Sequence, residues 1–143
     1  IKDNGKGMSQ DFLAKVTDPW TTTRTTRKVG IGLPLIKMNT ELCGGSMNIE
    51  SKLGKGTTLR FWFQHDHIDR APMGDIAGTI VMLCAQHEDI HYIYRHITDN
   101  GEYTFDTNEV KEALDGMSMN DINIIKYLKE MIQENLEEIG YNE

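Results

Sequence analysis

Lys2-Asp3-Asn4-Gly5-Lys6-Gly7-Met8 is the stretch that decides how this sequence folds. It places the carboxylate of Asp3 at the end of a short strand, directly before a turn with two glycines. Glycine has no Cβ atom, so this turn can be tight and can leave bare backbone against which a flat ring lies. A carboxylate there accepts the exocyclic amino hydrogen of adenine, whereas guanine presents an oxygen at that position. The stretch therefore favours an adenine site.

Two later segments also fit an adenine nucleotide. Gly30-Ile31-Gly32 opens a helix that we expect to run to about Cys43, and the free N–H groups at a helix start form a phosphate site without side-chain help. Thr57 follows Gly54-Lys55-Gly56, and its hydroxyl can support Asp3 or a bridging water. Each motif alone occurs in many turns. Their order and combination make the signal specific.

The remaining pattern of the first half predicts one short helix, a loop and a hairpin. Ser9 is a natural N-cap for a helix over residues 10–16, which Asp18-Pro19 ends. Residues 20–28 are rich in Thr and Arg without apolar periodicity, which is typical of a loop. Residues 46–51 and 57–63 alternate apolar and polar side chains, which predicts two paired strands.

The second half begins with a polar linker over residues 65–72 and reads as a separate unit. We expect an apolar helix over 73–86, with the small residues of Gly74-x-x-x-Gly78 permitting close packing. A hairpin of strands 90–98 and 102–105 follows, joined at Asp99-Asn100-Gly101, whose Asn-Gly pair is a strong hairpin signal. The last two helices are expected to start at two capping pairs and to end near Gly116 and Gly140. The pairs are Asp106 with Glu109 and Ser118 with Asp121. The last helix is expected to have one continuous apolar face, formed by Ile124, Ile125, Leu128, Met131, Ile132, Leu136 and Ile139.

Composition and charge restrict the class of protein. With 38% hydrophobic and 26% charged residues, and no apolar run near the roughly 20 residues that span a bilayer, we expect a cytoplasmic protein without a membrane segment. Cys43 and Cys84 lack pair spacing and are expected to be reduced core residues. Residues 1–63 hold ten Lys and Arg against five Asp and Glu, a net charge of +5; residues 64–143 hold five against seventeen, a net charge of −12. The first part suits a polyanionic ligand and the second a basic partner or solvent.

Taken together, these motifs resemble the GHKL superfamily, which includes gyrase, histidine kinases, a heat-shock chaperone and mismatch-repair ATPases. Within it the match looks most like histidine kinases and their anti-sigma-factor relatives. The resemblance covers residues 1–63 and implies an α+β protein. We expect residues 1–66 to be the C-terminal part of a two-layer α/β sandwich of the Bergerat type. An appended helix, hairpin and two-helix unit over residues 73–143 completes the expected domain organisation.

The resemblance also assigns roles to individual residues. Asp3 would hold the adenine amino group, Gly5 and Gly7 would shape the floor beneath the ring, and Met8 would close over it. Trp20 stands where the family usually has phenylalanine. Residues 21–28 would form a lid over ATP. The expected phosphate contacts and glycine-box residues are Thr22, Arg24, Arg27, Lys28, Gly30, Gly32 and Leu33, and Thr57 completes the set.

The family binds ATP with Mg²⁺, and its metal ligand is an Asn on a helix upstream of the position of Asp3. Because the sequence starts at Ile1 without methionine, we expect a truncated chain in which that helix and the helix bearing the phosphoacceptor histidine are missing. We therefore assign no catalytic residue and expect weak or no Mg²⁺-ATP binding by these 143 residues. His65-x-His67 lacks a third ligand at suitable spacing and is interpreted as surface linker.

Two functions follow from the resemblance. In the first, the parent protein is a histidine kinase in signal transduction that transfers the γ-phosphate of ATP to a protein side chain. In the second, ATP orders the lid of a non-catalytic module that binds a protein partner, as in anti-sigma factors. The acidic unit over residues 73–143 is a candidate surface for such a partner. The sequence also allows a homodimer, and no nucleic acid partner is expected.

Overall fold

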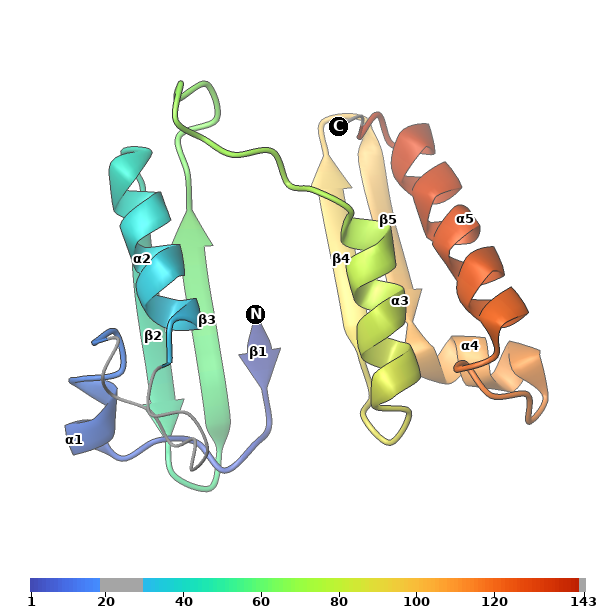
Figure 1. Ribbon diagram of the computed structural model, residues 1–143, viewed down its shortest axis with the longest axis horizontal. Coiled ribbons are helices and arrows are strands. Elements are labelled where there is room, and N and C mark those ends of the chain that lie inside the picture. The colour runs from blue at the N-terminus through green and yellow to red at the C-terminus, as the bar shows by residue number, and fades with distance from the viewer. Residues whose placement is uncertain (19–29, 142–143) are drawn as a thin grey trace. The chain divides into compact units, whose positions relative to one another are not determined.

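The computed structural model describes residues 1–18 and 30–141. In that part of the chain, five helices and two antiparallel sheets confirm the α+β fold. The chain divides into two compact units (Figure 1): Ile1–Ala71, here called the N-terminal unit, and Pro72–Glu143, the C-terminal unit.

The N-terminal unit is a three-stranded sheet covered by helices. Its strands are β1 (Lys2–Asp3), β2 (Ser46–Lys52) and β3 (Gly56–Trp62), in the order β1-β3-β2. The hairpin of β2 and β3 confirms the pairing predicted from their alternation, and β1 pairs with the start of β3. Helix α2 (Gly32–Leu42) covers one face of the sheet, and α1 (Gln10–Leu13) packs against β2.

Helix α1 begins where the sequence predicts and ends earlier. The Ser9 hydroxyl accepts the N–H of Phe12, which confirms it as the N-cap. The predicted end at Val16 is wrong, because the N–H groups of Lys15 and Val16 bond to carbonyls three residues back rather than four. The chain tightens into turns after Leu13, and these turns bury the Val16 side chain.

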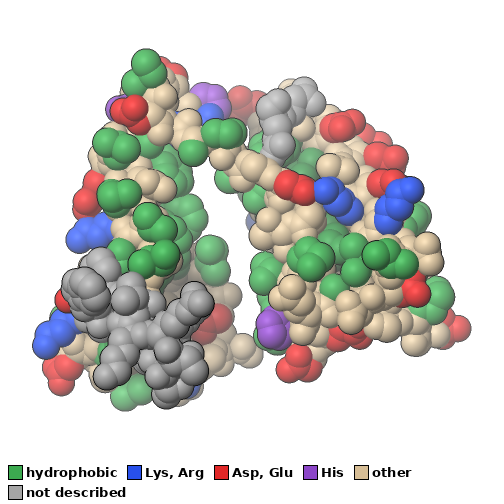
Figure 2. Space-filling model, viewed as in Figure 1, with side chains coloured by type: hydrophobic (Ala, Val, Ile, Leu, Met, Phe, Trp, Pro, Cys, Tyr) green, Lys and Arg blue, Asp and Glu red, His purple; other side chains and the backbone are tan. Residues whose placement is uncertain are grey.

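Helix α2 has a buried inner side and an exposed apolar side. Its inner side carries the fully buried Thr40 and leads to the buried Cys43. On the opposite side, four large apolar side chains spaced one helical turn apart are between 44% and 57% exposed, and hydrophobic atoms gather over α2 in Figure 2. They are Ile31, Leu35, Met38 and Leu42.

The C-terminal unit packs helices on a β-hairpin. It consists of α3 (Ile76–Gln86), β4 (Ile93–Thr98), β5 (Gly101–Asp106), α4 (Thr107–Leu114) and α5 (Ile122–Glu138). Helices α3 and α5 pack against each other, and side chains of α3, β5 and α5 share one core. Leu128, Ile132 and Leu136 of α5 lie in that core, which confirms the apolar face predicted from their spacing.

Two predicted helix starts in this unit are wrong. Helix α3 starts at Ile76 rather than Met73, because the Asp75 carboxylate caps it by accepting the N–H of Gly78. Gly74, with φ at +72°, therefore lies outside the helix, and Gly74-x-x-x-Gly78 is not a packing motif. Helix α5 is capped by Asp121, which accepts the N–H groups of Asn123 and Ile124, and not by Ser118.

The two other local predictions in this unit are close to the structure. Asp106 caps α4 through the N–H of Asn108, as predicted. The hairpin of β4 and β5 is confirmed, but β4 begins at Ile93 rather than Ile90, and Gly101 pairs with Thr98 as the first residue of β5. The connection is thus the two residues Asp99-Asn100, one fewer than the predicted Asp99-Asn100-Gly101.

Both cysteines are free and buried, as the sequence predicts. Burial raises the pKa of the Cys84 thiol to about 11. Among the described residues, the helices are too short or too polar to cross a bilayer.

Candidate nucleotide site

Strand pairing places Asp3 next to Thr57. The two residues are partners in the β1–β3 ladder, and Thr57 is also the partner of Ser51 on β2. Directly opposed residues point to the same face of a sheet. Leu59, two positions along β3, is buried on that face. The side chains of Asp3, Ser51 and Thr57 therefore belong to the face that packs under the helices.

The turn after β1 holds the Asp3 carboxylate beside bare backbone. Its Oδ1 atom accepts the N–H of Gly5 at 2.8 Å. A Cβ atom at Gly5 would lie only 2.9 Å from the same oxygen, so a side chain there would displace the carboxylate. Both residues are exposed to solvent. The turn thus presents an oriented, accessible carboxylate and a flat strip of backbone.

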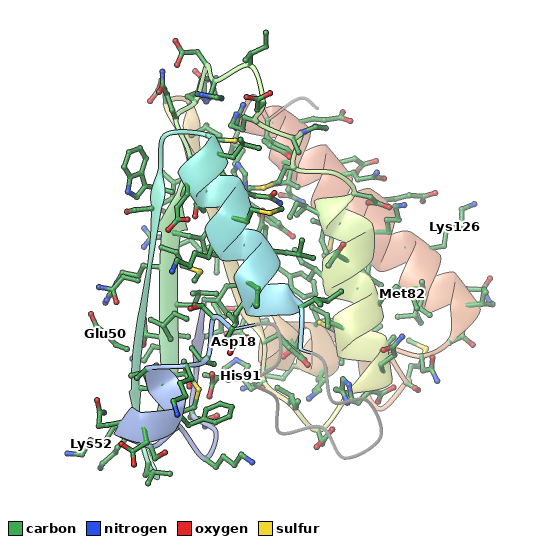
Figure 3. The ribbon with its side chains drawn as sticks, turned by 60° about the vertical axis from the view of Figure 1, so that its left-hand side comes forward. Asp18, Glu50, Lys52, Met82, His91 and Lys126 are labelled. Atoms are coloured by element: carbon green, nitrogen blue, oxygen red, sulfur yellow. The ribbon has the colours of Figure 1, made fainter. Side chains whose placement is uncertain are left out.

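A second turn packs directly against the first. Gly7 has φ at +66°, and a Cβ atom there would lie 2.0 Å from the carbonyl oxygen of Lys52 (labelled in Figure 3). Gly56 has φ at +95°, and its Cβ would lie 2.0 Å from the carbonyl oxygen of Asp3. The N–H of Gly54 donates to the carbonyl of Lys6 at 2.8 Å. The turn after β1 and the turn between β2 and β3 both need glycine, because their backbones are in direct contact. The two turns therefore form a single packed unit.

Ser51 joins these turns, and sequence reasoning missed it. Its Oγ atom accepts the N–H of Met8 at 2.9 Å and donates to the carbonyl of Gly56 at 3.0 Å. The hydroxyl of Thr57 lies 3.0 Å from it and is the donor of that pair, because Ser51 has one hydrogen to give. The alternation of residues 46–51 places Ser51 on the apolar face of the strand. A polar side chain on that face was the sequence feature that could have identified Ser51.

Helix α2 starts at the same end of the sheet as these turns (Figure 1). Its N-cap residue, Ile31, makes no side-chain cap, and nothing lies within 4 Å of a Cβ placed on Gly32. Pro34 has no N–H, which costs nothing in the first turn of a helix. Backbone N–H groups at such a start carry partial positive charge and bind anions. Gly30 and the half-buried Leu33 flank this point.

The structure brings together five of the residues singled out from the sequence, namely Asp3, Gly5, Gly7, Met8 and Thr57. Gly30, Gly32 and Leu33 lie together at the start of α2. The predicted lid contacts lie outside the described residues: Trp20, Thr22, Arg24, Arg27 and Lys28. The hydroxyl of Thr57 bonds to Ser51, while its backbone pairs with Asp3.

The described residues contain no group of three His, Cys, Asp or Glu side chains that could hold a metal ion. His67 contacts Asp69 in the linker, and the Asp3 carboxylate is held by the N–H of Gly5. The described carboxylates and imidazoles therefore do not form a three-ligand cation site.

Comparison with known families agrees with this geometry. Residues 1–67 match the family described as histidine kinase-, DNA gyrase B- and HSP90-like ATPase. The matched range contains all the strands and turns of the candidate site and ends in the linker. No solved structure matches the chain significantly.

Curated relatives are sensor proteins of bacteria. The chain is 28% identical to the sensor kinase CckA of Brucella abortus over 104 residues, 62% of this chain and 11% of the relative. It is 42% identical to a putative sensor protein of Shewanella frigidimarina over 64 residues, 44% of this chain and 10% of the relative. It is 31% identical to the sensor histidine kinase ZraS of Escherichia coli over 74 residues, 52% of this chain and 16% of the relative. The chain thus spans only a small part of these relatives.

Proposed function

Because residues 1–67 belong to the histidine kinase-, DNA gyrase B- and HSP90-like ATPase family, we propose that the N-terminal unit binds the adenine and phosphates of ATP. The observation that carries the proposal is the oriented Asp3 carboxylate beside the bare backbone of Gly5. The carboxylate would accept the adenine amino hydrogen, with Gly5 and Gly7 beneath the ring and Met8 over it. A carboxylate at this position discriminates against guanine.

The phosphates would lie at the start of α2. The uncapped N–H groups after Ile31 supply partial positive charge there, and Gly32 leaves the backbone open to an anion. Leu33 and Gly30 would shape this end of the site, with Thr22 and Lys28 of the lid as further phosphate contacts. Ser51 would act as a positioning residue, because it fixes Met8 and Thr57 relative to each other.

The family uses ATP together with Mg²⁺, and when bound the ion neutralises charge that develops on the phosphates. We propose that the parent protein is a kinase of the sensor class, transferring the γ-phosphate to a protein side chain. A single-turnover assay of the parent protein with labelled ATP tests this part of the proposal. Label retained on protein supports a kinase; nucleotide binding without retained label supports a nucleotide-gated interaction module.

The Asp3→Asn variant tests the adenine assignment. Asparagine keeps an oxygen that can accept the N–H of Gly5, so the turn should persist, but the charged acceptor for adenine is lost. Because a hydrogen bond to a charged group is worth about 1.5 to 3 kcal/mol, we expect ATP affinity to fall by about tenfold or more. Calorimetry measures this directly.

Asp11→Asn is the matched control. Asp11 is an exposed carboxylate in the first turn of α1, so its variant makes the same change in charge away from the proposed adenine contact. We expect this variant to keep its ATP affinity. Equal affinity of wild-type protein and Asp3→Asn for ATP would overturn the role of Asp3.

A further inference from the structure

An open apolar groove runs between α3 and α5 in the C-terminal unit. It encloses about 560 Å³, and its floor is formed by apolar parts of both helices, including Met82, Leu83 and Ile125. Met82 (labelled in Figure 3) is 47% exposed and Leu83 is 45% exposed. Near one end of the groove, Lys129 of α5 is paired with the Asp75 carboxylate that caps α3.

Helix α3 is apolar on its solvent side as well as on its core side. The core side holds five buried residues, Ala77, Ile80, Val81, Cys84 and Ala85. Met82 and Leu83 lie on the other side, where Ile125 of α5 also lines the groove. A helix that is apolar all round is normally covered on all sides. The groove side of α3 is therefore a surface suited to a partner.

Charge decides which partner fits. Residues 72–143 contain fifteen Asp and Glu against four Lys and Arg, a net charge of −11. Glu88 and Asp89 follow the C-cap residue of α3, whose C-terminal end carries partial negative charge, and Asp121 caps the start of α5. Lys111 donates to the carbonyl of Glu88, so three carboxylates and one ammonium group give this end of the groove a negative charge. A second copy of this chain would bring the same acidic surface to the groove, and like charges oppose that. Polyanions are disfavoured for the same reason.

We propose that this groove binds a basic amphipathic helix of a partner protein. Apolar side chains spaced three or four positions apart would contact Met82, Leu83 and Ile125, and Lys or Arg side chains would face the acidic groups at the end of α3. Helices that lie in grooves between two other helices use this spacing. Methionine suits such a surface because its unbranched, polarizable side chain adapts to different partners. The proposal does not depend on nucleotide binding.

The test uses the full 143-residue chain and a fluorescent synthetic helix of leucine and lysine with leucines at positions i, i+3, i+4 and i+7. Fluorescence anisotropy should show binding that weakens as salt is added, because exposed charges are screened. The same peptide with glutamate in place of lysine should not bind. Binding of both peptides alike, or of neither, would overturn the proposal.

Substitution in the groove locates the contact. The double variant Met82→Gln, Leu83→Gln should lose about tenfold or more in peptide affinity, because it removes the central apolar contacts. Ile97→Gln is the matched control, since Ile97 is 63% exposed on β4 and does not line the groove. Equal loss in both variants would contradict the site. Light scattering measures the oligomeric state. A dimer of the wild-type chain that becomes a monomer in the double variant would show that a second copy of the chain, and not a basic helix, occupies the groove.

Discussion

At the scale of single residues, Ser51 connects the turns of the candidate nucleotide site by hydrogen bonds. Its hydroxyl joins the N–H of Met8, the carbonyl of Gly56 and the hydroxyl of Thr57. These bonds use its one hydrogen and both lone pairs. The two glycine turns are therefore held together by a side chain as well as by backbone contact.

Replacing Ser51 by alanine should destabilise the chain by about 1 to 3 kcal/mol, because partly buried backbone groups lose their partner. Urea unfolding measures the change. Ser46→Ala is the control: Ser46 also accepts a hydrogen bond, from the Trp62 Nε1 atom, but at an exposed position of the same strand. Equal and small losses in the two variants would contradict the role assigned to Ser51.

We expect His96 to make the stability of the chain depend on pH. Its Nδ1 atom lies 2.7 Å from the Tyr94 hydroxyl, and its ring lies 4.6 Å from that of Tyr141. Burial lowers the pKa of His96 below its ordinary value of 6.5. The unfolded chain therefore binds a proton first as the pH falls below 6.5, so this residue contributes stability at neutral pH that is lost on acidification.

Between pH 7.5 and 5.5 we expect the urea midpoint of the wild-type chain to fall. The fall should be smaller in His96→Gln, which cannot take up the proton. His87→Gln, which changes an exposed histidine, should behave like the wild type. A fall in His96→Gln that matches the wild type would show that another group causes the pH dependence.

Sequence spacing was sufficient to predict the tight turn at Asp3 and Gly5, because the Asp3 carboxylate bonds to the Gly5 N–H within that turn. Gly7 also stood out in the sequence, but the contact that requires glycine there is with the distant carbonyl of Lys52. Ser51 could not be predicted in the same way. Its role depends on the register that places it opposite Thr57 and on the return of residues 3–8 to the hairpin end. The contact with Met8 joins positions 43 residues apart, so the local alternation shows only that Ser51 lies on the apolar face and not what it binds.

At the scale of the elements, helix α5 holds the C-terminal unit together. Ile132 is fully buried and lies among residues of α3 and the hairpin. Replacing it by alanine should cost about 2 to 5 kcal/mol, the range for large-to-small changes in a core. Tyr127→Ala, on the exposed side of the same helix, should cost much less, because Tyr127 is 62% exposed. Denaturant unfolding of the two variants compares them, and similar losses would contradict the assigned core.

Helix α5 was well predicted because seven apolar residues repeat with a helical period. The start of α3 was predicted wrongly, because Met73 and Gly74 are apolar like the helix that follows them. The helix begins only after Asp75, whose carboxylate is its N-cap. Ser118 is not the N-cap of α5 for a related reason. Met119 is only 1% exposed and packs in the core as part of the loop before the helix, and Asp121 accepts the first helical N–H groups. Composition identifies an element, whereas a hydrogen bond sets where it starts.

At the scale of the whole molecule, two units with opposite charge share one chain. Residues 1–63 carry a net charge of +5 and residues 64–143 one of −12. This difference is visible in the sequence, and it agrees with the proposed phosphate site in the first part and with the proposed binding of a basic helix in the second. The groove itself could not be predicted, because it depends on how α3 and α5 pack together.

We propose above that the glycine turns and the start of α2 form one site for ATP. The most direct measurement is an amide NMR titration of the 143-residue chain with ATP and with GTP, up to millimolar concentrations. We predict weak binding of ATP, with shifts at Gly5, Gly7, Met8 and Gly32, a smaller response to GTP, and no shifts in residues 72–143. Equal responses to both nucleotides, or shifts that avoid these glycines, would contradict the account.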